Sequence, residues 1–100
     1  LLIRLLTKEN QGKHLMIQYR GGNGSSKEKA VITVGAESEP GGVDAQFEYI
    51  EHKCGFFEIE SQLFFDEGDK QFDCLNVIGV TGNKEELWFD VTDYYGMDDD

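Results

Sequence analysis

The chain of 100 residues carries 20 acidic and 9 basic side chains, which gives a formal net charge of −11 at neutral pH. A field of that sign repels phosphate backbones and anionic lipid, so direct binding to nucleic acid or to a membrane surface is disfavoured, whereas basic proteins are attracted. Hydrophobic residues make up 39% of the chain, enough to bury a core instead of remaining disordered. We expect one domain over residues 1–100, in which residues 96–100 form an acidic tail.

The first predicted elements form a hairpin. Residues 1–9 suit a short helix and a strand equally well, because their leucines fit either period. Residues 13–20 alternate, with Leu15, Ile17 and Tyr19 on one face, and this predicts a half-buried strand. The run Gly21–Ser26 breaks the pattern, since glycine adopts the backbone angles of a reversal, and residues 29–35 resume as a strand rich in β-branched side chains.

A loop and two strands are expected in the middle of the chain. Residues 37–44 contain Pro40, Gly41 and Gly42 and predict a loop, and residues 45–51 then alternate as a short strand. Residues 56–65 show the clearest period of two. In that strand the apolar face holds Phe57, Ile59, Leu63 and Phe65, and the polar face holds Glu58, Glu60 and Gln62.

Two further strands follow a turn at Asp66–Asp69. Residues 71–80 are partly apolar on both faces between Cys74 and Val77, which predicts a bulge or a central strand covered on both sides. After a reversal at 81–83, residues 86–92 place Leu87, Phe89 and Val91 inward and Trp88 on the opposite face. The predicted fold is therefore mainly β: an antiparallel meander of about six strands forming a sandwich or barrel, with a short N-terminal helix as an option. The alternative is an α+β fold.

No catalytic residues, metal ligands or cofactor are predicted, and an enzyme is not favoured. His52 and Cys54 would share a face of a strand, either as metal ligands with His14 and Cys74 or as base and nucleophile, but no paired ligand spacing supports a site. A buried thiol and a surface imidazole explain them more simply. The acidic side chains near the turn, Asp66, Glu67, Asp69 and Asp73, suit calcium in chemistry but lack an EF-hand spacing, and a solvated turn explains them equally.

Aromatic residues outside the predicted core are the main indication of a function, because large aromatics anchor protein partners. Covering of both faces of the sheet would also explain them. The predicted partner-binding residues are Phe56, Phe64, Trp88, Tyr94, Tyr95, Glu58 and Glu60.

Three functions are compatible with this pattern. The first is an acidic protein-interaction module that binds a basic protein partner, as a small inhibitor or immunity-type protein or as a subunit of a complex. The second is a structural β domain that forms a homo-oligomer. The third is a small-ligand binder or enzyme whose site is assembled from residues distant in the sequence. Cysteine usage favours a cytoplasmic setting only slightly, because two cysteines are too few for a disulfide-rich secreted scaffold.

Overall fold

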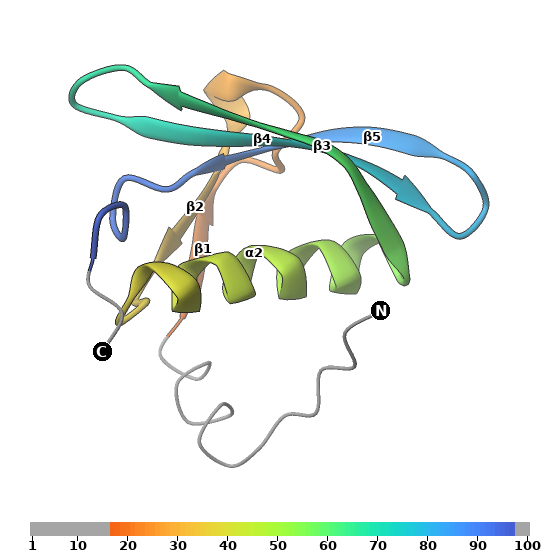
Figure 1. Ribbon diagram of the computed structural model, residues 1–100, viewed down its shortest axis with the longest axis horizontal. Helices are drawn as coiled ribbons and strands as arrows, with labels where there is room; N and C mark the ends of the chain where they lie inside the picture. Colours follow the sequence, from red (N-terminus) through yellow and green to blue (C-terminus); the bar gives the residue numbers. More distant parts are fainter. Residues whose placement is uncertain (1–16, 98–100) are drawn as a thin grey trace, which may run out of the picture.

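The computed structural model describes residues 17–97 (Figure 1). Within these residues the fold is mostly β, with one α-helix and one short 3-10 helix. The elements in chain order are β1 (Gln18–Gly21), η1 (Lys27–Lys29), β2 (Val31–Val34), α2 (Glu39–Cys54), β3 (Phe57–Asp66), β4 (Gln71–Gly79) and β5 (Lys84–Asp90). The predictions for residues 1–9 and 13–16, for His14 and for the tail residues 98–100 lie outside the described residues.

The five described strands form one sheet in the order β1-β2-β5-β4-β3. β1 and β2 pair as the predicted hairpin, and β3, β4 and β5 form an antiparallel meander. β5 then lies parallel to β2, which makes the sheet mixed. The prediction of a mainly β fold is confirmed, but an antiparallel meander of about six strands forming a sandwich or barrel is not: among the described residues the sheet is open and mixed, has five strands, and is covered by a helix.

Helix α2 occupies the stretch that was expected to be a loop and a short strand, so the predictions for residues 37–44 and 45–51 are wrong. The Ser38 side chain accepts a hydrogen bond from the Gly41 N–H at 3.1 Å and caps the helix. Pro40 lies in the first turn, where its missing N–H costs nothing. Gly55, with φ of 74°, ends the helix, and its N–H bonds to the Glu51 carbonyl.

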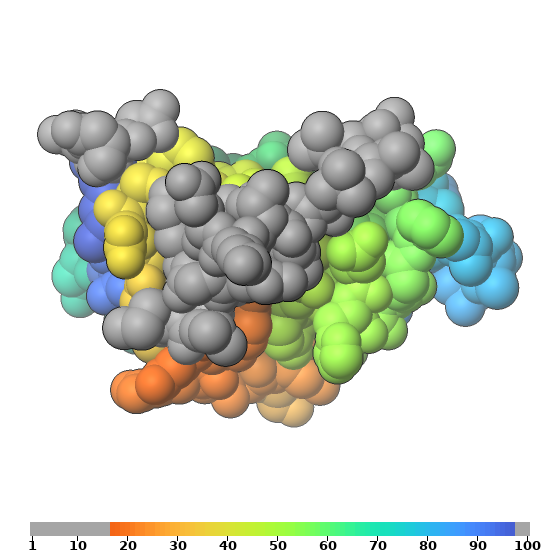
Figure 2. All heavy atoms as spheres, turned by 90° about the horizontal axis from the view of Figure 1, so that it is seen from below, coloured from red at the N-terminus to blue at the C-terminus, as the bar shows by residue number. Residues whose placement is uncertain are grey.

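The core lies between α2 and one face of the sheet. Figure 1 shows α2 along one side of the strands and η1 on the other side, and Figure 2 shows α2 at the surface of its own side. The predicted inward positions Leu87, Phe89 and Val91 are confirmed as buried. The Tyr49 ring of α2 meets the Phe89 ring edge-on at 5.7 Å between centroids. No helix among residues 17–97 combines the length and the apolar character that crossing a membrane requires.

Strand β3 changes face halfway along its length. Its register against β4 shifts between Ile59 and Ser61, so one extra residue interrupts the period of two. Ile59 pairs with buried Val77 on the helix side, whereas Leu63 pairs with Cys74 on the opposite side. The prediction that Phe57, Ile59, Leu63 and Phe65 share one face is therefore wrong, because the bulge turns the second pair away from the core.

Candidate protein-binding face

The sheet face opposite α2 carries a connected set of apolar side chains, which we call the outer strip: Leu63, Phe65, Phe72, Cys74 and Trp88. Directly paired residues of neighbouring strands place their side chains on the same face. Leu63 of β3 pairs with Cys74 of β4, and Cys74 pairs with Trp88 of β5, which makes one row across three strands. Phe65 and Phe72 form the start of the next row.

Aromatic stacking holds the exposed part of the outer strip in place. The rings of Phe65 and Trp88 stack with centroids 5.3 Å apart and planes inclined by 29°. Beneath them Phe72 and Cys74 are buried, whereas Leu63 is 51% exposed and Phe65 is 36% exposed. A rigid, partly exposed aromatic pair next to an exposed leucine has the composition of a protein-interface anchor.

Carboxylates frame the outer strip. Glu86 accepts a hydrogen bond from the Trp88 indole N–H at 3.2 Å, which fixes the orientation of the indole ring. Glu60 pairs with Lys84 at 3.3 Å, and Glu67 pairs with Lys27 at 2.6 Å. The apolar centre with charged side chains at its border matches the core-and-rim arrangement of protein interfaces.

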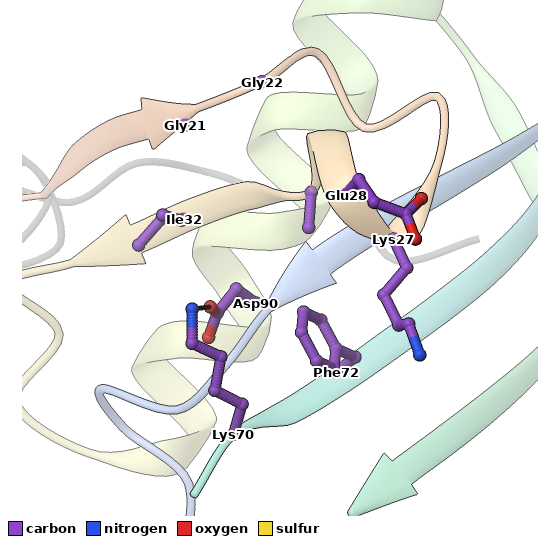
Figure 3. Close-up of a pocket in the computed structure, with 9 residues that line it drawn as sticks. Gly21, Gly22, Lys27, Glu28, Ile32, Lys70, Phe72 and Asp90 are labelled. Carbon is purple, nitrogen blue, oxygen red and sulfur yellow. Dashed lines mark ion pairs between the residues drawn. The ribbon is translucent and has the colours of Figure 1, made fainter. Parts of the chain in front are cut away.

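A groove continues from the outer strip toward the β1–β2 hairpin (Figure 3). Its volume is about 260 Å³, and Phe72 and Ile32 give it apolar walls. The Lys27 ammonium lies 6.0 Å from the centre of the Phe72 ring, and Lys70 lies 3.9 Å from the Asp90 carboxylate. Because both cations are held beside carboxylates, the groove adds no positive site to the face. Its lining residues are Gly21, Gly22, Lys27, Glu28, Ala30, Ile32, Lys70, Phe72 and Asp90.

The predicted partner-binding residues do not form one cluster. Trp88 lies in the outer strip, whereas Phe64 lies on the helix side of β3 and stacks on Tyr95 at 5.0 Å between centroids. Phe56 is 66% exposed but precedes β3 at the end of the strand remote from Trp88. The expectation that Tyr94 is exposed is wrong, because its side chain is only 1% exposed.

The two predicted carboxylates lie beside the bulge of β3, and both are exposed. Glu58 pairs with Ile78 of β4 across the strands, and Glu60 stands where the register shifts. Both lie toward the α2 end of β3, and the paired residues Ser61, Asn76 and Glu86 stand between Glu58 and the outer strip. Their predicted role in partner binding stays a prediction.

Tyr94 belongs to a polar cluster inside the core. The Gln46 amide N–H₂ of α2 donates to the Asp73 carboxylate at 2.9 Å and to the Tyr94 hydroxyl. Burial raises the pKa of the Tyr94 phenol well above its usual range, so the hydroxyl stays protonated. This cluster ties α2 to β4 and to the segment after β5, and we assign it a structural role.

Replacing Asp73 by asparagine is expected to stabilise the protein at pH 7, because asparagine carries no charge to bury at this position. Burial raises the pKa of Asp73, a hydrogen bond from Gln46 offsets part of that rise, and the negative charge of Glu39 adds to it. The folded state therefore binds the proton more tightly than the unfolded state does. The unfavourable contribution is absent below the unfolded pKa and develops as the pH rises through the folded pKa.

Urea unfolding of Asp73→Asn and the wild type at pH 7 and at about pH 4 checks this expectation. The stability advantage of the variant is expected to shrink at the lower pH. A variant that is equally destabilised at both pH values would contradict it.

The structure does not support a nucleophilic or metal site at His52 and Cys54. Both residues lie in the last turn of α2, where side chains two residues apart point in different directions. Burial and the nearby Glu85 raise the pKa of the Cys54 thiol, and the thiol donates to the Glu85 carboxylate at 3.6 Å. Burial likewise raises the pKa of Cys74 to about 11, with a further contribution from Glu86. At neutral pH both groups are thiols, which are poor nucleophiles.

The acidic turn also does not assemble into a metal site. The Asp66 carboxylate accepts hydrogen bonds from the Gly68 N–H and the Gln71 side chain, which lower its pKa. Glu67 is paired with Lys27, and Asp73 lies in the core beside Gln46. Within residues 17–97 no group of three or more histidine, cysteine or carboxylate side chains could hold a metal ion.

Sequence reasoning missed Leu63, Phe65 and Phe72 as members of this face. The missed signal lies inside β3, a strand of ten residues. Glu58 and Glu60 alternate with apolar residues, but Glu60 is followed directly by the polar pair Ser61–Gln62. Two adjacent polar residues interrupt strict alternation and are compatible with a bulge.

No family model matches the chain, no curated protein matches its sequence, and no solved structure matches its fold.

Proposed function

We propose that this chain is a protein-interaction module that binds a basic protein partner through the outer strip. The observation that carries the proposal is the partly exposed, stacked Phe65–Trp88 pair beside the exposed Leu63 on the sheet face opposite α2. Residues of this kind lose little side-chain entropy on binding, and they supply a large contact area. The function is therefore binding, and its affinity comes from the apolar centre of the face.

The net charge of −11 supports a basic partner. Charge complementarity accelerates association and excludes acidic competitors, while salt screens it over a Debye length of about 8 Å at physiological ionic strength. Glu86, next to Trp88, is placed to meet a cationic side chain beside the apolar contact, and Glu58 and Glu60 add negative charge farther along the same face. Association is accordingly expected to slow as salt is raised.

Replacing Trp88 by alanine is expected to weaken partner binding by about tenfold or more, because truncation of an anchoring aromatic residue typically costs above 1 kcal/mol of binding free energy. The measurement is capture of proteins from source lysate on the immobilised wild-type chain and on Trp88→Ala, with elution by rising salt. The wild type is expected to retain a basic protein that salt releases.

Phe56→Ala is the matched control, because Phe56 is an exposed aromatic at the far end of β3. Leu63→Ser probes the same face with little risk to folding, since Leu63 is half exposed. Equal retention by Trp88→Ala, Leu63→Ser and the wild type would overturn the proposal, as would an acidic partner whose retention ignores salt.

A further inference from the structure

Strand β3 forms a long edge of the sheet. Among the described residues its only strand neighbour is β4, so one side of its backbone faces no other described strand. The opposite edge, β1, has four residues, whereas β3 has ten. Short edge strands resist the addition of another strand, and long ones accept it. β3 is therefore the edge at which this sheet can be extended.

The backbone groups that point to the open side of β3 follow from the hairpin turn. The Glu67 N–H donates to the Lys70 carbonyl at 2.8 Å, so these two residues form a hydrogen-bonded pair. Hydrogen-bonded pairs recur at every second residue of an antiparallel ladder, which directs the backbone of Phe65 and Leu63 toward β4. The N–H and C=O groups of Gln62 and Phe64 then point to the open edge.

The hydrogen bonds between β4 and β5 lead to the same assignment of which backbone groups face β3. The Val91 N–H donates to the Gln71 carbonyl at 2.8 Å, and the Gly79 N–H donates to the Asn83 carbonyl at 2.9 Å. Odd-numbered residues of β4 thus bond to β5, which leaves its even-numbered residues for β3. Phe72 and Cys74, the partners of Phe65 and Leu63, are even-numbered.

Apolar side chains flank this edge on both faces of the sheet. Leu63 and Phe65 lie on the outer face, while Phe64, which is 46% exposed, lies on the helix side. A strand added beside Gln62–Phe64 would therefore find apolar contacts for both sets of its alternating side chains. The edge offers backbone hydrogen bonds and side-chain contacts at the same place.

Charge selects the occupant of the edge. Glu60 stands at one end of the neutral stretch, and Asp66 and Glu67 stand at the other. A second copy that pairs antiparallel with Gln62 opposite Phe64 would place Glu60 opposite Asp66, and like charges opposed across strands are destabilising. A segment with basic residues toward its ends meets carboxylates at both ends of the same stretch: Glu60, which is shared with Lys84, at one end, and Asp66 with the Lys27-paired Glu67 at the other.

We infer that the edge of β3 beyond the bulge takes up an extended, basic segment of the partner as an additional strand, with the Gln62 and Phe64 backbone groups as its hydrogen-bonding partners. This inference rests on the proposed function and specifies its recognition mode, which is β-strand addition. The backbone bonds supply register, and Leu63, Phe64 and Phe65 supply contacts for the alternating side chains.

The test uses a capped peptide of about six residues, the length of a typical strand, in which lysine and valine alternate. Hydrogen–deuterium exchange is followed by NMR on the full chain with and without the peptide. In the free protein the Gln62 and Phe64 amides are expected to exchange faster than the Leu63 and Phe65 amides. With the peptide bound, Gln62 and Phe64 are expected to slow by about tenfold or more, because a new ladder protects them. The same peptide with glutamate in place of lysine is expected to leave them unchanged.

Gln62→Pro isolates the contribution of the edge, because proline removes the N–H that points outward and leaves the bonds to β4 in place. Its matched control is Gln62→Ala, which shortens the same side chain and keeps the N–H. Gln62→Pro is expected to bind the lysine peptide at least about tenfold more weakly than Gln62→Ala does. The exchange measurement on the wild type stands on its own if the proline variant folds poorly.

The outcomes separate this inference from the proposed function. If Trp88→Ala lowers capture of the partner while Gln62→Pro does not, and the Gln62 and Phe64 amides stay unprotected, the partner docks on the face without adding a strand and the inference is wrong. If Trp88→Ala has no effect on capture, the proposed function is wrong. Protection of Gln62 and Phe64 without peptide, accompanied by a doubled mass in light scattering, would assign the edge to a second copy and overturn the inference.

Discussion

Replacing Phe89 by alanine is expected to lower the free energy of unfolding by about 3–5 kcal/mol, the range found when a buried phenylalanine is truncated. Phe89 lies in β5, in the middle of the sheet, and its side chain is fully buried against α2. The Tyr49 ring contacts it edge-on, so the substitution removes an aromatic contact and leaves a cavity that neighbours on rigid elements fill only in part. Urea unfolding followed by far-UV circular dichroism measures the change.

The control for this prediction is Phe56→Ala, which removes the same side chain from a position that is 66% exposed. Its expected effect is within about 0.5 kcal/mol. Phe89→Leu is expected to lose less stability than Phe89→Ala, because leucine retains most of the buried volume. Similar losses for Phe56→Ala and Phe89→Ala would show that the core does not lie between α2 and β5.

Replacing Gly42 by alanine is expected to destabilise the fold by about 1–3 kcal/mol, although alanine favours a helix over glycine by about 1 kcal/mol. Gly42 lies in α2, and a Cβ atom added there would overlap the ring of Tyr94. The ring has little room to move, since it is buried and its hydroxyl is bonded to Gln46. Thermal unfolding measures the effect, and about 1 kcal/mol corresponds to about 4–8 °C for a domain of this size.

Gly41→Ala is the matched control, because it makes the same change one residue earlier in the same helix. A Cβ at Gly41 would meet only the Ser38 side chain, at 3.2 Å. We expect Gly41→Ala to be neutral or slightly stabilising through its gain in helix propensity. Equal destabilisation by both alanines would contradict the role assigned to the Tyr94 contact.

The strands after residue 56 were predictable because local patterns determine them. Alternation located β3, β4 and β5, and the glycine-containing turns between them were confirmed. The buried positions Leu87 and Phe89 followed from the same pattern. Pairing between β2 and β5 was not predictable, because residues far apart in the sequence form it and no short-range signal encodes it.

Helix α2 was missed because two local signals pointed elsewhere. Pro40, Gly41 and Gly42 suggest a loop when their position in the first helical turn is unknown, and Ala45, Phe47 and Tyr49 alternate. The signals for the helix were present as well. Ser38 is a good N-cap, Gly55 is a good C-terminal residue, and the buried positions of the helix recur three and four residues apart: Gly42, Ala45, Gln46 and Ile50.

The candidate site was only partly predictable, because a single inserted residue decides which side chains reach it. Trp88 was placed on the outer face from the alternation of its strand, and the structure agrees. Leu63 and Phe65 were assigned to the core, because strict alternation along β3 would place them on the same face of the sheet as Phe57. The bulge between Ile59 and Ser61 reverses that assignment.

The most direct test of the outer strip as a binding surface uses the single tryptophan of the chain, Trp88. Incorporation of 5-fluorotryptophan places one fluorine label in the strip, and ¹⁹F NMR follows it as the captured basic partner is added. We expect a changed chemical shift and loss of the solvent isotope shift in the saturated complex, because the partner excludes water from the indole. A resonance that keeps both its chemical shift and its solvent isotope shift in the saturated complex would contradict binding at this face.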